Sequence, residues 1–153
     1  DTSDGGRQGV AAGDRVWSHG GMLRFARLRS VVRWFLAAAM VFAGVSHLFW
    51  ARKEFRAQVP AWTKEIIDED ATVVASGVVE IMLGGALVAL PASRSRVGAL
   101  LAAFFIAVFP GNIAQWRDKR DGFGLDTDAK RLTRLFFQPV LVWAAWWSTR
   151  TRR

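Results

Sequence analysis

Long apolar stretches alternate with short polar segments along the chain. The apolar stretches cover residues 31–51, 71–91, 97–116 and 132–149. A helix rises ~1.5 Å per residue, so each stretch is long enough to cross a hydrocarbon core of ~30 Å. Charged residues crowd into the segments between these stretches and toward both ends of the chain. The pattern predicts an all-α integral membrane protein, a left-handed four-helix transmembrane bundle.

The N-terminal region differs from the rest in composition. Residues 1–21 are rich in glycine and polar residues without helical or strand periodicity, which predicts a disordered segment. Met22 would make a natural start for a small membrane protein. We therefore expect a single four-span domain over residues 22–149, followed by a basic tail at 150–153.

Three connections of different character join the predicted spans. Residues 52–70 are too polar to span but carry apolar residues at helical spacing, so we expect an interfacial helix or lid that is broken at Pro60. A tight turn is expected at 91–95, and a polar, glycine-containing loop at 117–130.

The distribution of basic residues predicts the orientation. The side of the membrane that carries both termini has a slight excess of Lys and Arg, and tight Arg clusters flank the first and fourth spans. Basic residues concentrate on the cytoplasmic side of membrane proteins. We therefore expect a multi-pass protein of the inner (plasma) membrane with both termini in the cytoplasm.

The composition excludes several kinds of chemistry. The chain has no Cys and only two His, His19 and His47, so it can form no disulfide, no thiolate metal site and no histidine-rich metal cage, and we expect no metal site. Its net charge of +8 could indicate nucleic-acid binding. Because the arginines sit beside apolar spans, anionic lipid headgroups are the favoured partner, and no nucleic acid is expected.

Five polar residues interrupt the predicted spans: His47, Glu80, Asn112, Arg134 and Gln138. Such groups are costly in hydrocarbon, so we expect them to face the interior of the bundle. Measured along each helix from the side that bears the longer connections, their depths range from ~3 Å for Arg134 to ~14 Å for Glu80. The five residues therefore lie in one half of the bilayer and are the candidate ligand-binding residues.

A purely structural interpretation of the same residues is also open. Glu80 with Arg134 could form an ion pair, and Asn112 with Gln138 an amide contact, that only fix the register of the helices. In the second span, residues 84–85 are both glycine, which predicts a close approach of a neighbouring helix.

Several short motifs lie in order along the spans. They are FAGVSHLF at 42–49, Val59-Pro60, SGVVEI at 76–81, VFPGNI at 108–113 and RLFFQPVLVW at 134–143. Together they resemble the DoxX family of small four-span bacterial membrane proteins, over about residues 31–147. The chain departs from the family pattern in the fourth span, where Phe136 stands in place of a proline and Pro139 follows Gln138.

The resemblance implies a function in membrane redox chemistry. The DoxX family is similar to a subunit of a thiosulfate:quinone oxidoreductase, so we expect a subunit of a bacterial membrane oxidoreductase system. The polar half of the bundle would then bind a quinone or lipid headgroup through the five residues named above. The chain has no redox centre of its own and we expect no covalently bound cofactor, so a quinone is the candidate cofactor and catalytic turnover stays open.

The expected partners are membrane lipids, a protein of the oxidoreductase complex and a second copy of the chain. The alternative to the oxidoreductase interpretation is a non-enzymatic scaffold or accessory subunit whose intramembrane polar cluster is structural. A transporter is disfavoured, because four spans with one buried acidic residue lack the paired repeats and discontinuous helices usual in that class.

Overall fold

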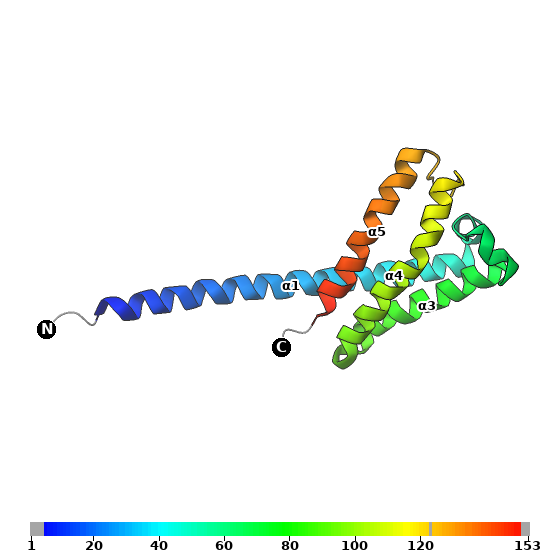
Figure 1. Ribbon diagram of the computed structural model, residues 1–153. Coiled ribbons are helices and arrows are strands. Elements are labelled where there is room, and N and C mark those ends of the chain that lie inside the picture. The colour runs from blue at the N-terminus through cyan, green and yellow to red at the C-terminus, as the bar shows by residue number, and fades with distance from the viewer. Residues whose placement is uncertain (1–4, 123, 151–153) are drawn as a thin grey trace.

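Helix caps and prolines divide the chain at the predicted polar connections. The computed structural model describes residues 5–122 and 124–150, and within these residues it is all-helical, with no strand. Figure 1 shows the order of the elements. They are α1 (Gly5–Phe49), α2 (Arg52–Arg56), the 3-10 helix η1 (Ala61–Glu65), α3 (Glu69–Ala89), the 3-10 helix η2 (Pro91–Ser93), α4 (Arg94–Arg117) and α5 (Asp128–Thr149).

Side-chain caps explain where two of the long helices begin. The Asp68 carboxylate accepts hydrogen bonds from the backbone N–H groups of Asp70 and Ala71 at the start of α3. At the start of α5, the Thr127 hydroxyl accepts from the N–H of Lys130. Both residue types supply the acceptor that the first turn of a helix lacks.

The four predicted spans fall within α1, α3, α4 and α5 to within a few residues. By length and composition, three helical segments are able to cross a membrane: Leu23–Phe49, Glu69–Ala89 and Pro91–Arg117. Helix α5 is not among them, because Arg134, Gln138 and three tryptophans lower its mean hydropathy. The all-helical prediction is therefore confirmed, and three of the predicted spans coincide with helices that are long and apolar enough to cross a membrane.

Helix α1 is much longer than the first predicted span. It begins at Gly5, although residues 1–21 were expected to be disordered, and it projects beyond the other helices in Figure 1. No proline lies between residues 5 and 49, so nothing interrupts the backbone hydrogen bonds of the helix upstream of Met22. Residues 1–4, and residues 151–153 of the predicted basic tail, lie outside the described residues.

The connection between α1 and α3 breaks at Pro60, as predicted. Helix α2 precedes the proline and η1 follows it, while the buried side chain of Val59 anchors the segment between them. The carbonyl of Val59 also accepts a hydrogen bond of 2.9 Å from Nη1 of Arg120 in the α4–α5 loop. The two longer connections are thereby joined at one end of the molecule.

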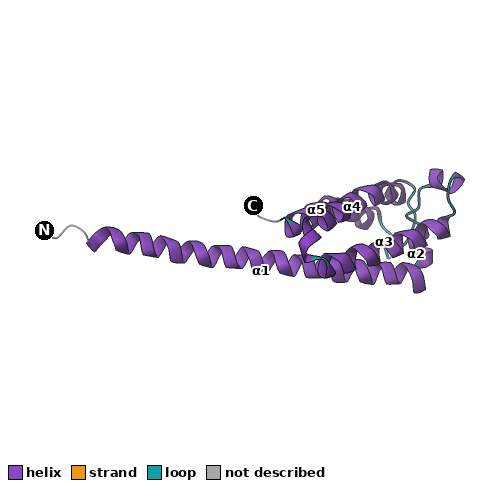
Figure 2. Cartoon of the chain, turned by 90° about the horizontal axis from the view of Figure 1, so that it is seen from below, coloured by secondary structure: helices purple, strands orange, loops and turns teal. Residues whose placement is uncertain are grey.

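The long helices pack in two layers, as the view in Figure 2 shows: α1 lies against α3, and α4 lies against α5. A core of buried apolar side chains fills the space between the layers. It includes Leu36, Met40, Leu87, Leu101, Phe105 and Ala145. Many large apolar side chains instead face outward, among them Phe35, Phe42, Met82, Ile106 and Phe136. An outer surface of this kind suits a hydrocarbon environment.

Of the two adjacent glycines in α3, only Gly84 packs closely against another helix. A Cβ at Gly84 would lie 2.8 Å from the carbonyl oxygen of Ala37, so only glycine allows α1 and α3 to approach this closely here. A Cβ at Gly85 would meet nothing within 4 Å. The prediction that both glycines serve close packing is therefore wrong for Gly85, because adjacent helix positions point in different directions.

Candidate functional site

His47 and Glu80 form a buried pair between α1 and α3. Nδ1 of His47 lies 2.9 Å from Oε2 of Glu80, although the two groups are not aligned as a hydrogen bond. Ser76, one turn earlier on α3, donates from its hydroxyl to Oε1 of Glu80 over 3.2 Å. The ring of Phe55 in α2 packs against the His47 imidazole and covers the pair.

The partner of Glu80 is therefore His47, and the expected ion pair between Glu80 and Arg134 is replaced by this contact. The close approach of α1 and α3 explains why Glu80 pairs with His47 and not with Arg134. A Cβ at Gly77 would lie 2.8 Å from the Cβ of His47, so the absence of a side chain at Gly77 brings His47 next to Glu80, which lies three residues further along α3.

Arg134 on α5 donates hydrogen bonds to the neutral amide side chains of two glutamines. Its Nη2 donates to Oε1 of Gln58 over 2.8 Å, and its Nη1 to Oε1 of Gln115 over 3.4 Å. Neither glutamine is among the site residues predicted from the sequence. Gln115 follows Asn112 by three residues and shares its helix face, so this spacing could have predicted that Gln115 lies at the site. Gln58 lies in a connection without regular periodicity, so no sequence pattern marks it.

The predicted amide contact between Asn112 and Gln138 is confirmed. Nδ2 of Asn112 donates to Oε1 of Gln138 over 3.1 Å, and Nε2 of Gln138 donates to the carbonyl of Phe105 over 2.6 Å. Both side chains are buried. This chain of hydrogen bonds ties α5 to α4 and satisfies the oxygen of Gln138 within the protein.

An inner cavity of about 260 Å³ lies between α1, α4 and α5. Its polar end is formed by Gln58, Asn112, Arg134 and Gln138. Its walls are apolar and include the buried or half-buried side chains of Leu36, Met40, Phe104 and Leu141. Phe35 and Phe137 also line it and are exposed at the outer surface, so the cavity is open on that side. A ligand with a small polar head and an apolar tail matches such a lining.

Gln58, which lines this inner cavity, carries an unused donor. An arginine has only donors, so the amide oxygen of Gln58 must face Arg134, and the Nε2 group points the other way. That Nε2 is buried and has no hydrogen-bond partner among the described residues. A buried donor without an acceptor is costly, and an oxygen acceptor on a ligand would satisfy it.

A second cavity of about 260 Å³ lies beneath α2 and η1. His47 and Ser76 line it from α1 and α3, Thr63 lines it from η1, and Gln58 lines both cavities. The five predicted site residues are thus divided: Asn112, Arg134 and Gln138 line the inner cavity, whereas His47 pairs with Glu80 and lines the second cavity. Among the described residues, no group of three or more His, Cys, Asp or Glu side chains gathers as a metal site requires.

Several basic residues around the longer connections pair with carboxylates. Hydrogen bonds to Asp70 raise the pKa of the Arg56 guanidinium above its usual value. The buried guanidinium of Arg131 contacts both Asp121 and Asp128. These pairs hold the connections to the ends of α3 and α5, and so position Gln58 next to Arg134.

The fold and these two cavities define an all-helical protein with three helices able to cross a membrane and with polar groups enclosed among its helices. The chain belongs to the family described as Domain of unknown function (DUF8561), whose model matches residues 36–149. The matched range contains both polar clusters. No curated protein and no solved structure matched the chain in the same comparisons.

Proposed function

We propose that the chain is a four-span membrane protein that binds a quinone headgroup, or a lipid headgroup with an equivalent carbonyl oxygen, in the inner cavity. The observation that carries the proposal is the buried, unpartnered Nε2 of Gln58, a residue that lines the polar end of that cavity. A quinone carbonyl supplies the missing acceptor, and the apolar walls suit its isoprenoid tail.

The fourth span would be α5. Its residues Phe136, Phe137, Val140 and Trp143 are exposed and apolar, whereas Gln138 is buried toward α4. This division is what a helix needs when lipid surrounds it on one side and protein on the other. The charge of Arg134 would be held at the polar end of the inner cavity, near one end of the helix.

The biological role we propose is that of a subunit of a bacterial inner-membrane oxidoreductase system, with both termini in the cytoplasm. The DoxX-like motifs of the spans support this role. Electrons would pass between the quinone and a redox centre in a partner protein, and the residues of this chain would bind and orient the quinone. The chain would then be an accessory subunit rather than an enzyme in its own right.

A second candidate is a scaffold whose polar residues are structural. The hydrogen bonds from Asn112 to Gln138 and from Gln138 to Phe105 favour it, because they satisfy these amides without any ligand. The two candidates differ in what they predict for Gln58, whose free donor has no structural use.

Mass spectrometry of the lipids that remain on the detergent-purified protein tests the proposal. The parent chain should retain a quinone or a carbonyl-bearing lipid. The variant Gln58→Glu keeps an oxygen for Arg134 but replaces the free donor with a second acceptor, so it should lose most of that ligand. Gln115→Glu is the matched control, because Gln115 also accepts from Arg134 but does not line the inner cavity.

Two outcomes would refute quinone or lipid binding in the inner cavity. One is a folded parent protein that carries no quinone and no stoichiometric lipid after mild purification. The other is a Gln58→Glu variant that retains the ligand at the level of Gln115→Glu. Either result leaves the scaffold candidate standing.

A further inference from the structure

Arginines gather at the end of the helix assembly opposite the longer connections, which we call the arginine end. They come from α1, from the start of α4 and from the C-terminus of α5, and are Arg29, Arg33, Arg94, Arg96 and Arg150. The sequence has no Asp or Glu in residues 15–53, 81–117 or 129–153, which contain all of these positions. The positive charge of the arginine end is therefore not balanced by neighbouring carboxylates of the same segments.

The contacts at this end bring like charges together. Nη2 of Arg29 donates to the backbone carbonyl of Arg150, and Arg29 and Arg94 are both close enough to Arg33 to repel it electrostatically. Nε of Arg94 is buried and has no hydrogen-bond partner within the part of the chain that the structure describes. An external anion would relieve the repulsion and supply the missing acceptor.

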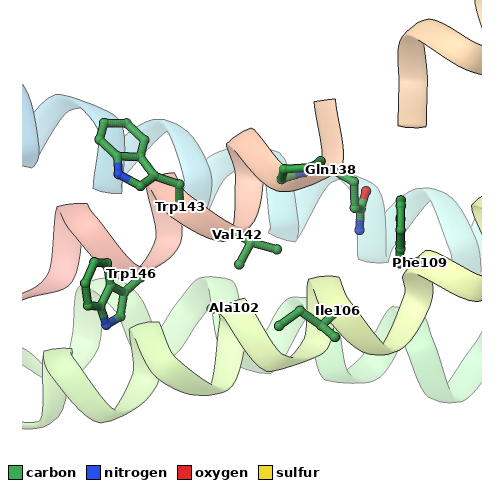
Figure 3. Close-up of a pocket in the computed structure, with 8 residues that line it drawn as sticks. Ala102, Ile106, Phe109, Gln138, Val142, Trp143 and Trp146 are labelled. Carbon is green, nitrogen blue, oxygen red and sulfur yellow. The ribbon is translucent and has the colours of Figure 1, made fainter. Parts of the chain in front are cut away.

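An apolar groove of about 560 Å³ lies along α4 and α5, and Figure 3 shows the residues that line it. Its lining is almost entirely carbon: Ala102, Ile106 and Phe109 from α4, and Gln138, Pro139, Val142, Trp143 and Trp146 from α5. The Arg150 guanidinium lies 3.9 Å above the ring of Trp146. Thr149 packs against Gly98, so the C-terminus of α5 lies beside the first turns of α4, where Arg94 is found.

We infer that this groove and the arginines at its end bind one anionic phospholipid. The phosphate would lie near Arg150 and Arg94, and an acyl chain would follow the groove from Trp146 toward Ile106. Charge complementarity selects an anionic headgroup, and the apolar groove that continues from it selects a lipid over an acidic protein segment. This site lies on the outer surface and does not depend on a ligand in the inner cavity.

Native mass spectrometry of the purified full chain with equal amounts of phosphatidylglycerol and phosphatidylcholine tests the inference. We expect phosphatidylglycerol to be retained roughly thirtyfold better, as expected for interactions with two arginines near a lipid surface. The double variant Arg94→Gln/Arg150→Gln should lose this selectivity. Arg52→Gln/Arg117→Gln makes the same change in charge near the longer connections and should keep it.

The groove is tested separately from the charges. Ile106→Trp places a large ring in the groove and should displace the lipid, whereas Val78→Trp, at an exposed position on α3, should not. Glycerol phosphate, which has the anionic group without acyl chains, should compete only weakly. Equal retention of the two lipids by the parent, parent-level selectivity in Arg94→Gln/Arg150→Gln, or full retention by Ile106→Trp would each overturn the inference.

Discussion

The two ends of the helix assembly differ in whether their basic residues, which lie next to apolar helices, have acidic partners within the chain. At the loop end, formed by α2, η1 and the α4–α5 loop, basic groups meet carboxylates, as in the pairs Arg56–Asp70, Lys130–Asp126 and Arg131–Asp128. At the arginine end, the segments that supply the cations contain no acidic residue. The loop end supplies its own counter-charges, whereas the arginine end needs counter-charges from its surroundings.

The difference bears on both orientation and stability. Unbalanced arginines next to apolar spans favour the cytoplasmic side of a membrane, where anionic lipids provide the counter-charge. Paired charges at the loop end hold the connections in place and keep Gln58 next to Arg134. The following predictions test whether the two ends differ as described.

The largest expected effect concerns topology. The chain contains no Cys, so single cysteines report accessibility directly. In intact cells, a membrane-impermeant thiol reagent should label Asp126→Cys at the loop end and leave Ser95→Cys at the arginine end unlabelled. Because Ser95 is exposed at the start of α4, both sites should react equally after permeabilisation. The reverse labelling pattern would place the arginine end outside the cytoplasm.

The buried pair beneath the loop end should show the next largest effect. His47→Ala leaves the Glu80 carboxylate without its partner in a buried setting, which should lower the free energy of unfolding by about 3 kcal/mol or more. The double variant His47→Phe/Glu80→Leu removes both polar groups and should recover much of that loss. Unfolding in detergent, followed by tryptophan fluorescence, measures both. A double variant no more stable than His47→Ala would show that packing, and not the contact between the two polar groups, stabilises this region.

A smaller effect is expected when one cation is removed from each end. Arg131→Gln removes the contacts with Asp121 and Asp128. It should lower the free energy of unfolding by about 1.5 kcal/mol, the low end of the range for hydrogen bonds to charged groups, because both carboxylates are largely exposed to solvent. Arg96→Gln, at an exposed site of the arginine end, should change it by less than ~0.5 kcal/mol. Thermal unfolding of the two variants side by side gives the comparison. Equal losses would mean that the pairs at the loop end add nothing to stability.

The smallest expected effect is the response to acid. Hydrogen bonds from Arg117 and Lys130 lower the pKa of Asp118 and Asp126 below the usual value of 3.8. A carboxyl with a lowered pKa in the folded state stabilises the protein above its usual pKa, and this contribution is lost as the pH falls through the lower folded value. The Tm should therefore fall slightly below pH 3.8, and less in Asp118→Asn/Asp126→Asn. The same fall in the double variant would assign the acid response to other groups.

Much of the fold could be predicted from local pattern alone. The apolar stretches, the break at Pro60 and the turn at Pro91 follow from hydropathy and from the missing N–H of proline, and these depend only on neighbouring residues. The candidate site was predictable only in part. Polar residues within apolar helices must face inward, which identified His47, Glu80, Asn112 and Gln138, all of which are buried.

The sequence by itself determined which segments are helical, which residues are costly in an apolar environment, and that residues 15–53, 81–117 and 129–153 include no Asp or Glu. Only the tertiary structure decided which of these residues meet. Glu80 pairs with His47 because Gly77 lets two helices come close, and Gln58 reaches Arg134 because the connection folds back over the helix ends. Helix rotation and the path of a connection depend on contacts between residues far apart in the chain, and no local pattern of residue types specifies them.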